Sequence, residues 1–494
     1  MNLLFFNSLF ISIEGVNTME KGLEKRYGLV TAICMVVGIV IGSGVFFKAQ
    51  TILQTTNGDM PLGILAWIIG GLIMLVCARA FATMATKYEK VNGIVDYAEA
   101  TVGPRYAYIV GWFAATIYFP AMTSVLAWLT ARYTLVFVQS MNPDLVLTEG
   151  GAVVGSECMA LSLFFMCFAY AVNALSPKLA GYLQVSTTFI KLVPLGLMAV
   201  VGVGYGLYTG QLTENFTAEP IQMAADVVNT NPLFGAVVAT AFAYEGWIIA
   251  TSINSEIKDS KKNLPIALTV GSLIIMAVYI LYYIGVAGGA SNQQLMDEGA
   301  TVAFINIFGG VLGNILNLFI AISCLGTLNG LMVASTRGIY GLAARNNGPR
   351  PQMFKQIDEE TKMASNSSIF GLMACAIWFV FFYGANLAPT NWFGIFGFDS
   401  SELPIITIYG LYIPIFISFM KTATELGTFK RFVMPSLAIA GSVFMVFAAL
   451  YAHGYKPYLN AQAAGGFACP VLFYLILFAV VMVVGVMIDK KNHK

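Results

Sequence analysis

The chain is divided into long hydrophobic blocks that are separated by short polar segments. Because about 20 apolar residues in a helix cross the hydrocarbon core of a bilayer, this pattern predicts twelve transmembrane helices in an all-α polytopic membrane protein. We expect the spans at residues 28–50, 61–86, 105–138, 159–175, 181–207, 232–254, 266–289, 305–340, 367–387, 391–419, 431–452 and 468–488. The segments between them are too short to fold as separate domains.

Glycines interrupt two of these spans at mid-length, the first span and the sixth. An unwound backbone inside a membrane is tolerated only where it is buried in protein or lines a cavity. Matching interruptions in two halves of a chain point to a shared binding site near the membrane midplane. The pattern therefore predicts a transporter with substrate-binding residues Val40, Ile41, Gly42, Ser43 and Gly44 in the first span and Phe242, Ala243, Tyr244, Glu245 and Gly246 in the sixth.

The composition agrees with a membrane protein and excludes several other classes. Hydrophobic residues make up 58% of the 494 positions and charged residues 10%, and the formal net charge of +1 gives no basic surface for nucleic acid. The seven cysteines form no CxxC pair and there are only two histidines. We therefore expect no metal site, no cofactor and no disulfide framework.

The basic residues predict the orientation, because Lys and Arg accumulate on the cytoplasmic side of a membrane. With the N-terminus inside, 21 of the 26 basic residues fall in cytoplasmic segments, and the outer loops hold only Lys48 and Lys456. We expect a cytoplasmic N-terminal segment at 1–27 and a cytoplasmic tail at 489–494. Met19 is an alternative start, in which case 1–18 would not be translated. No signal peptide is expected, because the first residues lack a basic start and a cleavage site.

Ionisable residues inside spans are costly and are therefore candidate functional groups. Arg79 and Arg132 lie toward span ends, where we expect them to reach the interface. Lys191 lies within the fifth span and needs carbonyl or carboxylate partners. Glu245 lies near the centre of the sixth span, where three roles remain open: a neutral carboxyl bonded between helices, recognition of an amine, or transport of a proton.

Several motifs resemble the amino acid, polyamine and organocation (APC) superfamily. Residues 41–46 (IGSGVF) are similar to its GSGIF signature, and residues 242–247 (FAYEGW) resemble the FAYGGW of the L-type amino acid transporter branch. Residues 256–265 and 325–330 are similar to the loop after the sixth span and to the eighth-span pattern of that branch. The resemblance extends over nearly the whole chain.

This resemblance implies a LeuT-type fold of five plus five inverted repeats with two extra helices. The repeats would be residues 28–207 and 232–419, with the added helices in 431–488. It also implies that the N–H groups of Gly42, Ser43 and Gly44 and the Ser43 hydroxyl hold a substrate carboxylate. The carbonyl groups of Val40, Phe242 and Glu245 would accept the substrate ammonium. Lys191 matches the fifth-span lysine of sodium-independent relatives and would reach Gly38 and the region of Ser323.

The function implied is secondary transport of amino acids by alternating access across the cytoplasmic membrane, independent of sodium and either by exchange or coupled to protons. The family usually has a small or apolar residue at the position of Glu245, so a cationic amino acid or polyamine is an alternative substrate, and a sensor that does not transport is a further alternative. No catalytic constellation of an enzyme and no nucleotide-binding loop is present. Besides substrate and lipid, we expect no obligatory protein subunit, because residues 140–157 contain no cysteine for a bridge to a partner chain.

Overall fold

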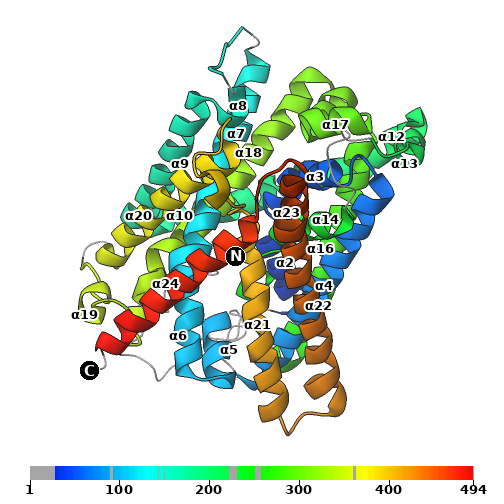
Figure 1. Ribbon diagram of the computed structural model, residues 1–494. Helices are drawn as coiled ribbons and strands as arrows, with labels where there is room; N and C mark the ends of the chain where they lie inside the picture. Colours follow the sequence, from blue (N-terminus) through cyan, green and yellow to red (C-terminus); the bar gives the residue numbers. More distant parts are fainter. Residues whose placement is uncertain are drawn as a thin grey trace.

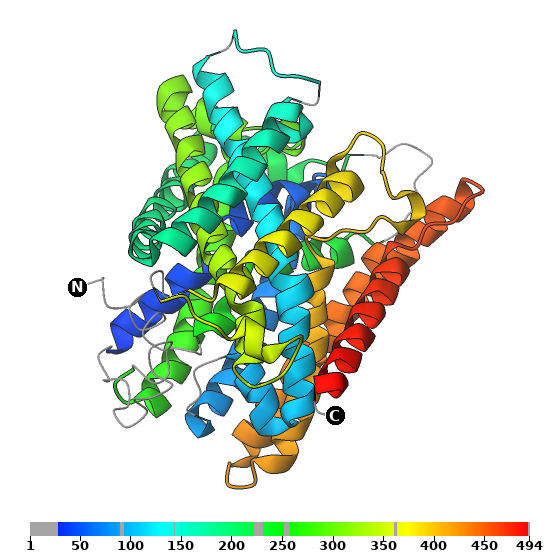
Figure 2. The same cartoon turned by 90° about the vertical axis from the view of Figure 1, so that its left-hand side faces the viewer.

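The computed structural model of the protein describes residues 28–88, 93–142, 144–149, 151–221, 231–250, 257–359 and 363–492. The chain forms one bundle of helices, drawn in Figures 1 and 2. The predicted N-terminal segment 1–27 lies outside the described residues, as do residues 493 and 494 of the predicted tail.

The first half of the bundle contains both long helices and helices broken by short irregular turns. Its elements are α2 (Leu29–Val40), α3 (Gly44–Thr55), α4 (Met60–Lys87), α5 (Ile94–Thr101), α6 (Pro104–Phe113), the π-helix η2 (Ala114–Tyr118), α7 (Phe119–Met141), α8 (Gly151–Val154), α9 (Ser156–Leu175), α10 (Pro177–Ile190), α11 (Leu192–Leu197), the π-helix η3 (Met198–Gly202), α12 (Val203–Thr209) and α13 (Gln211–Thr217).

The second half repeats the alternation of broken and continuous helices. Its elements are α14 (Leu233–Ala243), α15 (Trp247–Ala250), α16 (Ser260–Ala287), α17 (Asn292–Glu298), α18 (Ala300–Ala343), α19 (Pro351–Phe354), α20 (Ser365–Phe382), the π-helix η5 (Tyr383–Leu387), the 3₁₀-helix η6 (Gly394–Phe396), α21 (Leu403–Thr422), the π-helix η7 (Phe429–Val433), α22 (Met434–Leu450), the π-helix η8 (Tyr451–Tyr455), α23 (Lys456–Ala463) and α24 (Pro470–Asn492).

Ten helices in the described residues are long and apolar enough to cross a membrane, and the bent pair of α2 and α3 makes an eleventh candidate. The apolar helix α14 is shorter than these, and the chain after α15 passes out of the described residues. The expectation of an all-α polytopic membrane protein is confirmed. The number of twelve spans stays a prediction, as does the division into two inverted repeats.

Glycines allow the close packing of the seventh predicted span on the fifth. A Cβ atom at Gly202 would lie 2.6 Å from the carbonyl oxygen of Gly285, and Gly206 faces Gly288 in the same way. Without side chains at these positions, the backbones of η3 and α12 lie directly on α16, which is a common way for helices to associate in lipid. The seam fixes the helix that carries Lys191 against the central bundle.

Two predicted spans differ from the observed helices. The tenth was expected to begin at residue 391, but α21 begins at Leu403. The preceding segment is apolar without being helical, apart from the short η6, because glycines interrupt it. The eleventh was expected to end at residue 452, whereas a continuous helix extends through η8 to Ala463.

One end of the bundle carries α8, α13 and α17 and the opposite end carries α5 and α19 (Figure 1). We call these the α17 end and the α5 end. The last helices, η8, α23 and α24, run along one edge of the bundle (Figure 2). The half-helix α14 and the start of α3 lie in the interior, together with the buried end of α2 at Val40, and the candidate site is formed there.

Candidate functional site

The two interrupted helices meet at their breaks. Helix α2 ends at Val40, α3 begins at Gly44, and the two half-helices are bent by 53°. A Cβ atom at Gly44 would lie 2.6 Å from the Cα atom of Ala243, the last residue of α14. The structure therefore brings together the two segments that the sequence analysis singled out.

Glycine is required at a second point of the contact. Gly246 has φ +108°, a backbone conformation that residues with a side chain rarely adopt. A Cβ atom there would also lie 3.4 Å from the carbonyl oxygen of Ile39 in α2. The break in the sixth span thus depends on glycine for its backbone conformation, and the break in the first span depends on it for the close approach of Gly44 to Ala243.

The start of α3 offers backbone donors toward the break. Its first N–H groups have no acceptor within the helix, and Ser43, which precedes the helix, does not cap them with its hydroxyl. A helix N-terminus with free N–H groups favours a carboxylate. Gly42 faces Thr327 of α18, whose Oγ1 atom would be 3.3 Å from a Cβ atom at that glycine.

One tyrosine hydroxyl group bonds to a carbonyl group at each of the two breaks. The Tyr279 oxygen, on α16, lies 3.2 Å from the carbonyl oxygen of Val40 and 3.1 Å from that of Ala243. Because α2 and α14 end here, these two carbonyl groups have no hydrogen-bond partner within their own helices. The hydroxyl group of Tyr279 is the donor to both. Sequence reasoning missed this residue, because nothing in the seventh span distinguishes it from the neighbouring Tyr282 and Tyr283.

Glu245 lies in the turn between α14 and α15. Both of its carboxylate oxygens are buried and have no hydrogen-bond partner among the described residues. The hydroxyl groups of Tyr118 on η2 and of Tyr409 and Tyr412 on α21 face this carboxylate. A buried carboxylate without a partner is costly, so the arrangement suits a group that takes up a proton or receives a cationic group from a substrate.

Lys191 lies at the junction of α10 and α11 and is 5% exposed. Its Nζ atom donates to the carbonyl oxygen of Gly38 at 2.7 Å, which confirms the contact predicted from the resemblance. Ser323 on α18 is also buried, and its hydroxyl has no hydrogen-bond partner within the described part of the chain. The fixed ammonium therefore ties the fifth span to α2 two residues before its end.

The two arginines inside spans bond to the protein. The Nη1 atom of Arg79 donates to the carbonyl oxygen of Pro265 and to Thr269. Arg132 donates to the side chain of Gln50 at 3.3 Å, and its guanidinium lies over the ring of Trp128. Both side chains are partly exposed, and the expectation that they extend to the membrane interface stays a prediction.

Lys48 was expected in an outer loop, and this prediction was wrong. It lies within α3, is 1% exposed, and its Nζ atom is 2.6 Å from the Glu402 carboxylate. Asn329 of α18 bonds to Asn173 and to the carbonyl oxygen of Ala180. It therefore connects α18 to α9 and α10.

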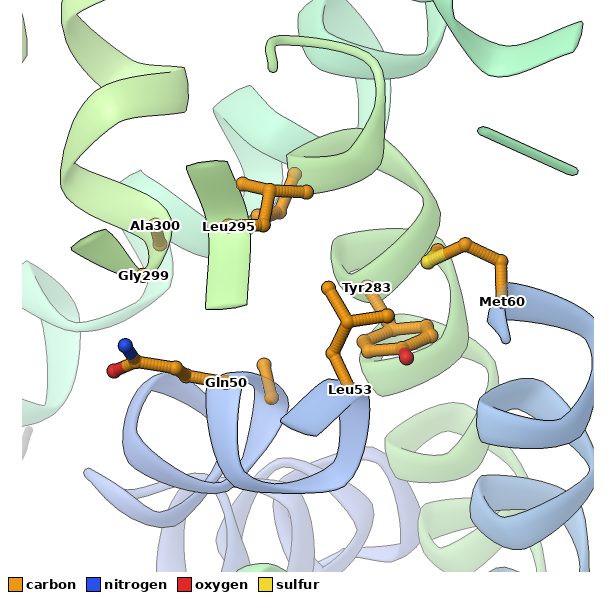
Figure 3. Close-up of a pocket in the computed structure, with 9 residues that line it drawn as sticks. Gln50, Leu53, Met60, Tyr283, Leu295, Gly299 and Ala300 are labelled. Carbon is orange, nitrogen blue, oxygen red and sulfur yellow. The ribbon is translucent and has the colours of Figure 1, made fainter. Parts of the chain in front are cut away.

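The α17 end of the site is closed. Gln50 and Gln54 on α3 both donate to the carbonyl oxygen of Met296 on α17, at 2.9 and 2.6 Å. The small cavity between these helices is shown in Figure 3 and has a volume of about 10 Å³. It has room for about one water molecule, so no amino acid passes between α3 and α17 in this conformation.

The geometry described so far agrees with the comparison with known protein families. The family described as amino acid permease matches residues 27–469. This chain belongs to the amino acid permease family. Members of the family are transporters, so the chain is a multi-pass membrane transporter of amino acids and no enzyme.

Individual relatives share about a quarter of their aligned residues with this chain. The chain is 28% identical to the serine/threonine exchanger SteT of Bacillus subtilis over 442 residues, which cover 87% of this chain and 92% of the relative. It is 25% identical to the human b(0,+)-type amino acid transporter 1 over 442 residues, covering 88% of this chain and 85% of the relative. It is 26% identical to the human cystine/glutamate transporter over 338 residues, covering 68% of this chain and 64% of that protein.

Proposed function

We propose that this permease exchanges amino acids across the cytoplasmic membrane by alternating access and without sodium. The observation that carries this proposal is the bond between the Lys191 ammonium and the Gly38 carbonyl. A fixed positive charge at the end of a broken helix supplies the electrostatic role that a bound cation would otherwise fill. The similarity to an exchanger over most of both chains supports exchange.

The proposed substrate site lies between the breaks. The N–H groups of Gly42, Ser43 and Gly44 hold the substrate carboxylate, in keeping with the free helix N-terminus at α3. The carbonyl groups of Val40, Phe242 and Glu245 accept its ammonium. Recognition through the backbone selects the zwitterion common to all amino acids, so the side-chain preference must come from other residues.

A neutral amino acid is the first candidate substrate, and a cationic amino acid or polyamine is the second. A neutral substrate agrees with the apolar surroundings of the breaks and with the similarity to a serine/threonine exchanger. The second candidate is favoured by one observation, the buried Glu245 carboxylate that lacks a partner. A substrate ammonium or guanidinium would supply that partner.

The orientation and the subunit composition are also part of the proposal. The positively charged cytoplasmic segments of the sequence include the region of α5 and α19, so we place the α5 end in the cytoplasm and the α17 end outside. Both termini are then cytoplasmic. No partner subunit is required, because residues 140–157 contain no cysteine that could form a bridge.

The test is uptake of labelled amino acids into proteoliposomes without sodium. Three kinds of vesicle are compared: empty, preloaded with unlabelled amino acids, and with an inward proton gradient. Uptake only into preloaded vesicles supports exchange, and uptake driven by the proton gradient supports symport. If no amino acid moves while polyamines do, the substrate class changes, and if nothing moves the sensor alternative is favoured.

Glu245→Gln separates the substrate candidates. If Glu245 binds a cationic substrate, the variant loses uptake of lysine and arginine and keeps that of serine. If Glu245 carries a proton, the variant loses the response to the proton gradient for every substrate. Glu219→Gln is the matched control, because Glu219 is exposed and its neutralisation leaves both properties unchanged.

A further inference from the structure

Three ionisable side chains from distant parts of the sequence meet at the α17 end. The Lys48 Nζ atom lies 2.6 Å from Oε1 of Glu402, and Nε2 of His453 lies 2.9 Å from Oε2 of the same carboxylate. The side chains of Lys48, Glu402 and His453 are only 1%, 7% and 17% exposed. We call these three residues the outer cluster.

The outer cluster joins three elements that are far apart in the sequence. Lys48 belongs to α3, Glu402 directly precedes α21, and His453 lies in the π-helix η8. The Ser401 hydroxyl, 3.4 Å from Lys48, lies on the same side. Because α3 is the half-helix that closes the cavity toward α17, its movement away from α21 would separate Lys48 from Glu402.

Separation of this pair is costly in the interior. Breaking a buried ion pair by removing one partner leaves a charge without compensation, which strongly disfavours the resulting state. The closed conformation of the α17 end therefore depends on the carboxylate of Glu402 remaining between its two neighbours. The backbone N–H of Glu402 also bonds to Asp399, which fixes the residue at the start of α21.

We propose that Lys48, Glu402 and His453 form a protonation-dependent latch that holds the outer side of the transporter closed. The inference rests on the proposed alternating access and adds a regulation to it. We assign them as positioning residues that act on the conformation of α3, and Lys48 connects them to the proposed site because its Nζ atom lies 5.3 Å from the centroid of the Phe242 ring. The latch is strongest when the imidazole is protonated, since an imidazolium ion pairs with a carboxylate more strongly than a neutral ring does.

The charged groups that face His453 are Glu402, Asp399 and Lys48. The helices α14 and α22, which pack on η8, contain no charged residue, and α24 has its charged residues, Asp489 to Lys491, at its opposite end. Lys456 begins α23, three positions after His453. Two carboxylates and one ammonium therefore face the imidazole, and their net negative charge favours its protonated form. Acidification of the outer solution protonates the imidazole and strengthens its bond to Glu402, so it favours the closed conformation.

The experiment measures opening of the outer side directly. Leu53 lines the small cavity in Figure 3 and is 2% exposed. A Leu53→Cys variant, with the exposed Cys34 and Cys167 and the partly exposed Cys469 replaced by serine, is reconstituted and treated from outside with a membrane-impermeant maleimide. The thiolate that reacts with maleimide itself becomes more abundant as the pH rises. Each labelling rate is therefore divided by that of a Glu219→Cys variant, an exposed position, at the same pH, and the labelling rate below means this ratio. We expect a low ratio at acidic pH and a ratio several-fold higher at alkaline pH, across the range of about pH 5 to 8 in which histidine changes charge.

Three substitutions test the cluster in this background. Lys48→Gln is expected to raise the labelling rate about tenfold or more. His453→Gln keeps a hydrogen-bond donor but cannot change charge, so labelling becomes independent of pH in this range. Lys456→Gln removes a basic residue near the same end without touching Glu402 and leaves both the rate and its pH dependence as they were.

Several outcomes overturn the latch. Wild-type labelling that does not change with pH, labelling that accelerates on acidification, or a pH dependence that persists in His453→Gln each contradicts it. If the cysteine variant does not fold, the pH dependence of exchange by the wild-type chain and by His453→Gln gives the same decision. Exchange that proceeds normally while these effects are missing rejects the latch and leaves the proposed function intact, whereas absence of any transport rejects the proposed function.

Discussion

The ammonium nitrogen of Lys191 lies 2.7 Å from the carbonyl oxygen of Gly38, at the end of the first half-helix. A carbonyl near a helix C-terminus carries a partial negative charge and is well suited to a cation. The bond connects α2 to the fifth span at the level where the substrate site is proposed. It places the nitrogen of the Lys191 side chain directly beside the break.

We expect Lys191→Met to reduce exchange at least about tenfold. The variant keeps the apolar stem and removes a charged hydrogen bond, which contributes about 1.5–3 kcal/mol. Exchange is measured in proteoliposomes at equal protein content. Lys421→Met, at an exposed position at the end of α21, serves as the control, and equal rates for the two variants would contradict the role given to Lys191.

Gly44→Ala tests the contact between the two breaks. The added Cβ would lie 2.6 Å from the Cα atom of Ala243, so the half-helices must move apart, and we expect a loss of stability of about 1–3 kcal/mol together with a loss of exchange. Thermal unfolding in detergent measures the first effect. Gly204→Ala on α12 has open space around the new Cβ and should unfold like the wild type, so equal unfolding temperatures would refute the close contact.

Tyr279→Phe removes the hydroxyl that bonds to the carbonyl groups of Val40 and Ala243. Because the proposed substrate ammonium competes for the Val40 carbonyl, we expect substrate to bind several-fold more tightly to the variant. A binding titration on the detergent-solubilised protein measures this change. Tyr282→Phe is the matched control, since the Tyr282 hydroxyl has no hydrogen-bond partner in the described part of the chain, and tighter binding in the control alone would exclude the competition.

The α5 end contains an ion pair that can be measured by a double-mutant cycle. The Nη2 atom of Arg345 on the segment after α18 lies 2.5 Å from Oδ1 of Asp96 on α5, while Glu99 is 3.8 Å away and half exposed. For Asp96→Asn combined with Arg345→Gln we expect a coupling free energy of about 1 kcal/mol in thermal unfolding. The cycle with Glu99→Gln should give a smaller value, and the reverse order would show that Glu99 is the stronger partner.

The sequence predicts the features that have a local signature. The glycines at residues 42, 44 and 246 stand out against the apolar residues around them, and this contrast located both breaks. Lys191 could be assigned because a lysine inside a span needs a partner and because the family resemblance suggested Gly38. The starting point of α21 was missed, since residues 392–398 are apolar and the glycines that interrupt them, Gly394 and Gly397, were not taken as helix breakers.

The outer cluster could not be predicted from the sequence. Lys48 and Glu402 are separated by 354 positions, and His453 follows Glu402 by 51. No local pattern connects residues so far apart, and a lysine near a span end is normally solvated. Tyr118, Tyr409 and Tyr412 were missed for the same reason, because an aromatic residue in a membrane helix is usually only a packing residue.

The contact of Gly44 with Ala243 has a mechanical consequence. Backbone lies directly on backbone at this point, and there is no side chain that could rotate or compress to absorb a displacement. A shift of α14 on one side of the substrate is therefore transmitted without loss to α3, and through α3 to the helices at the far end. The absence of a methyl group at Gly44 makes the crossing of the broken helices a rigid joint. A more compliant crossing would weaken the coupling between occupation of the site and the side to which the transporter is open.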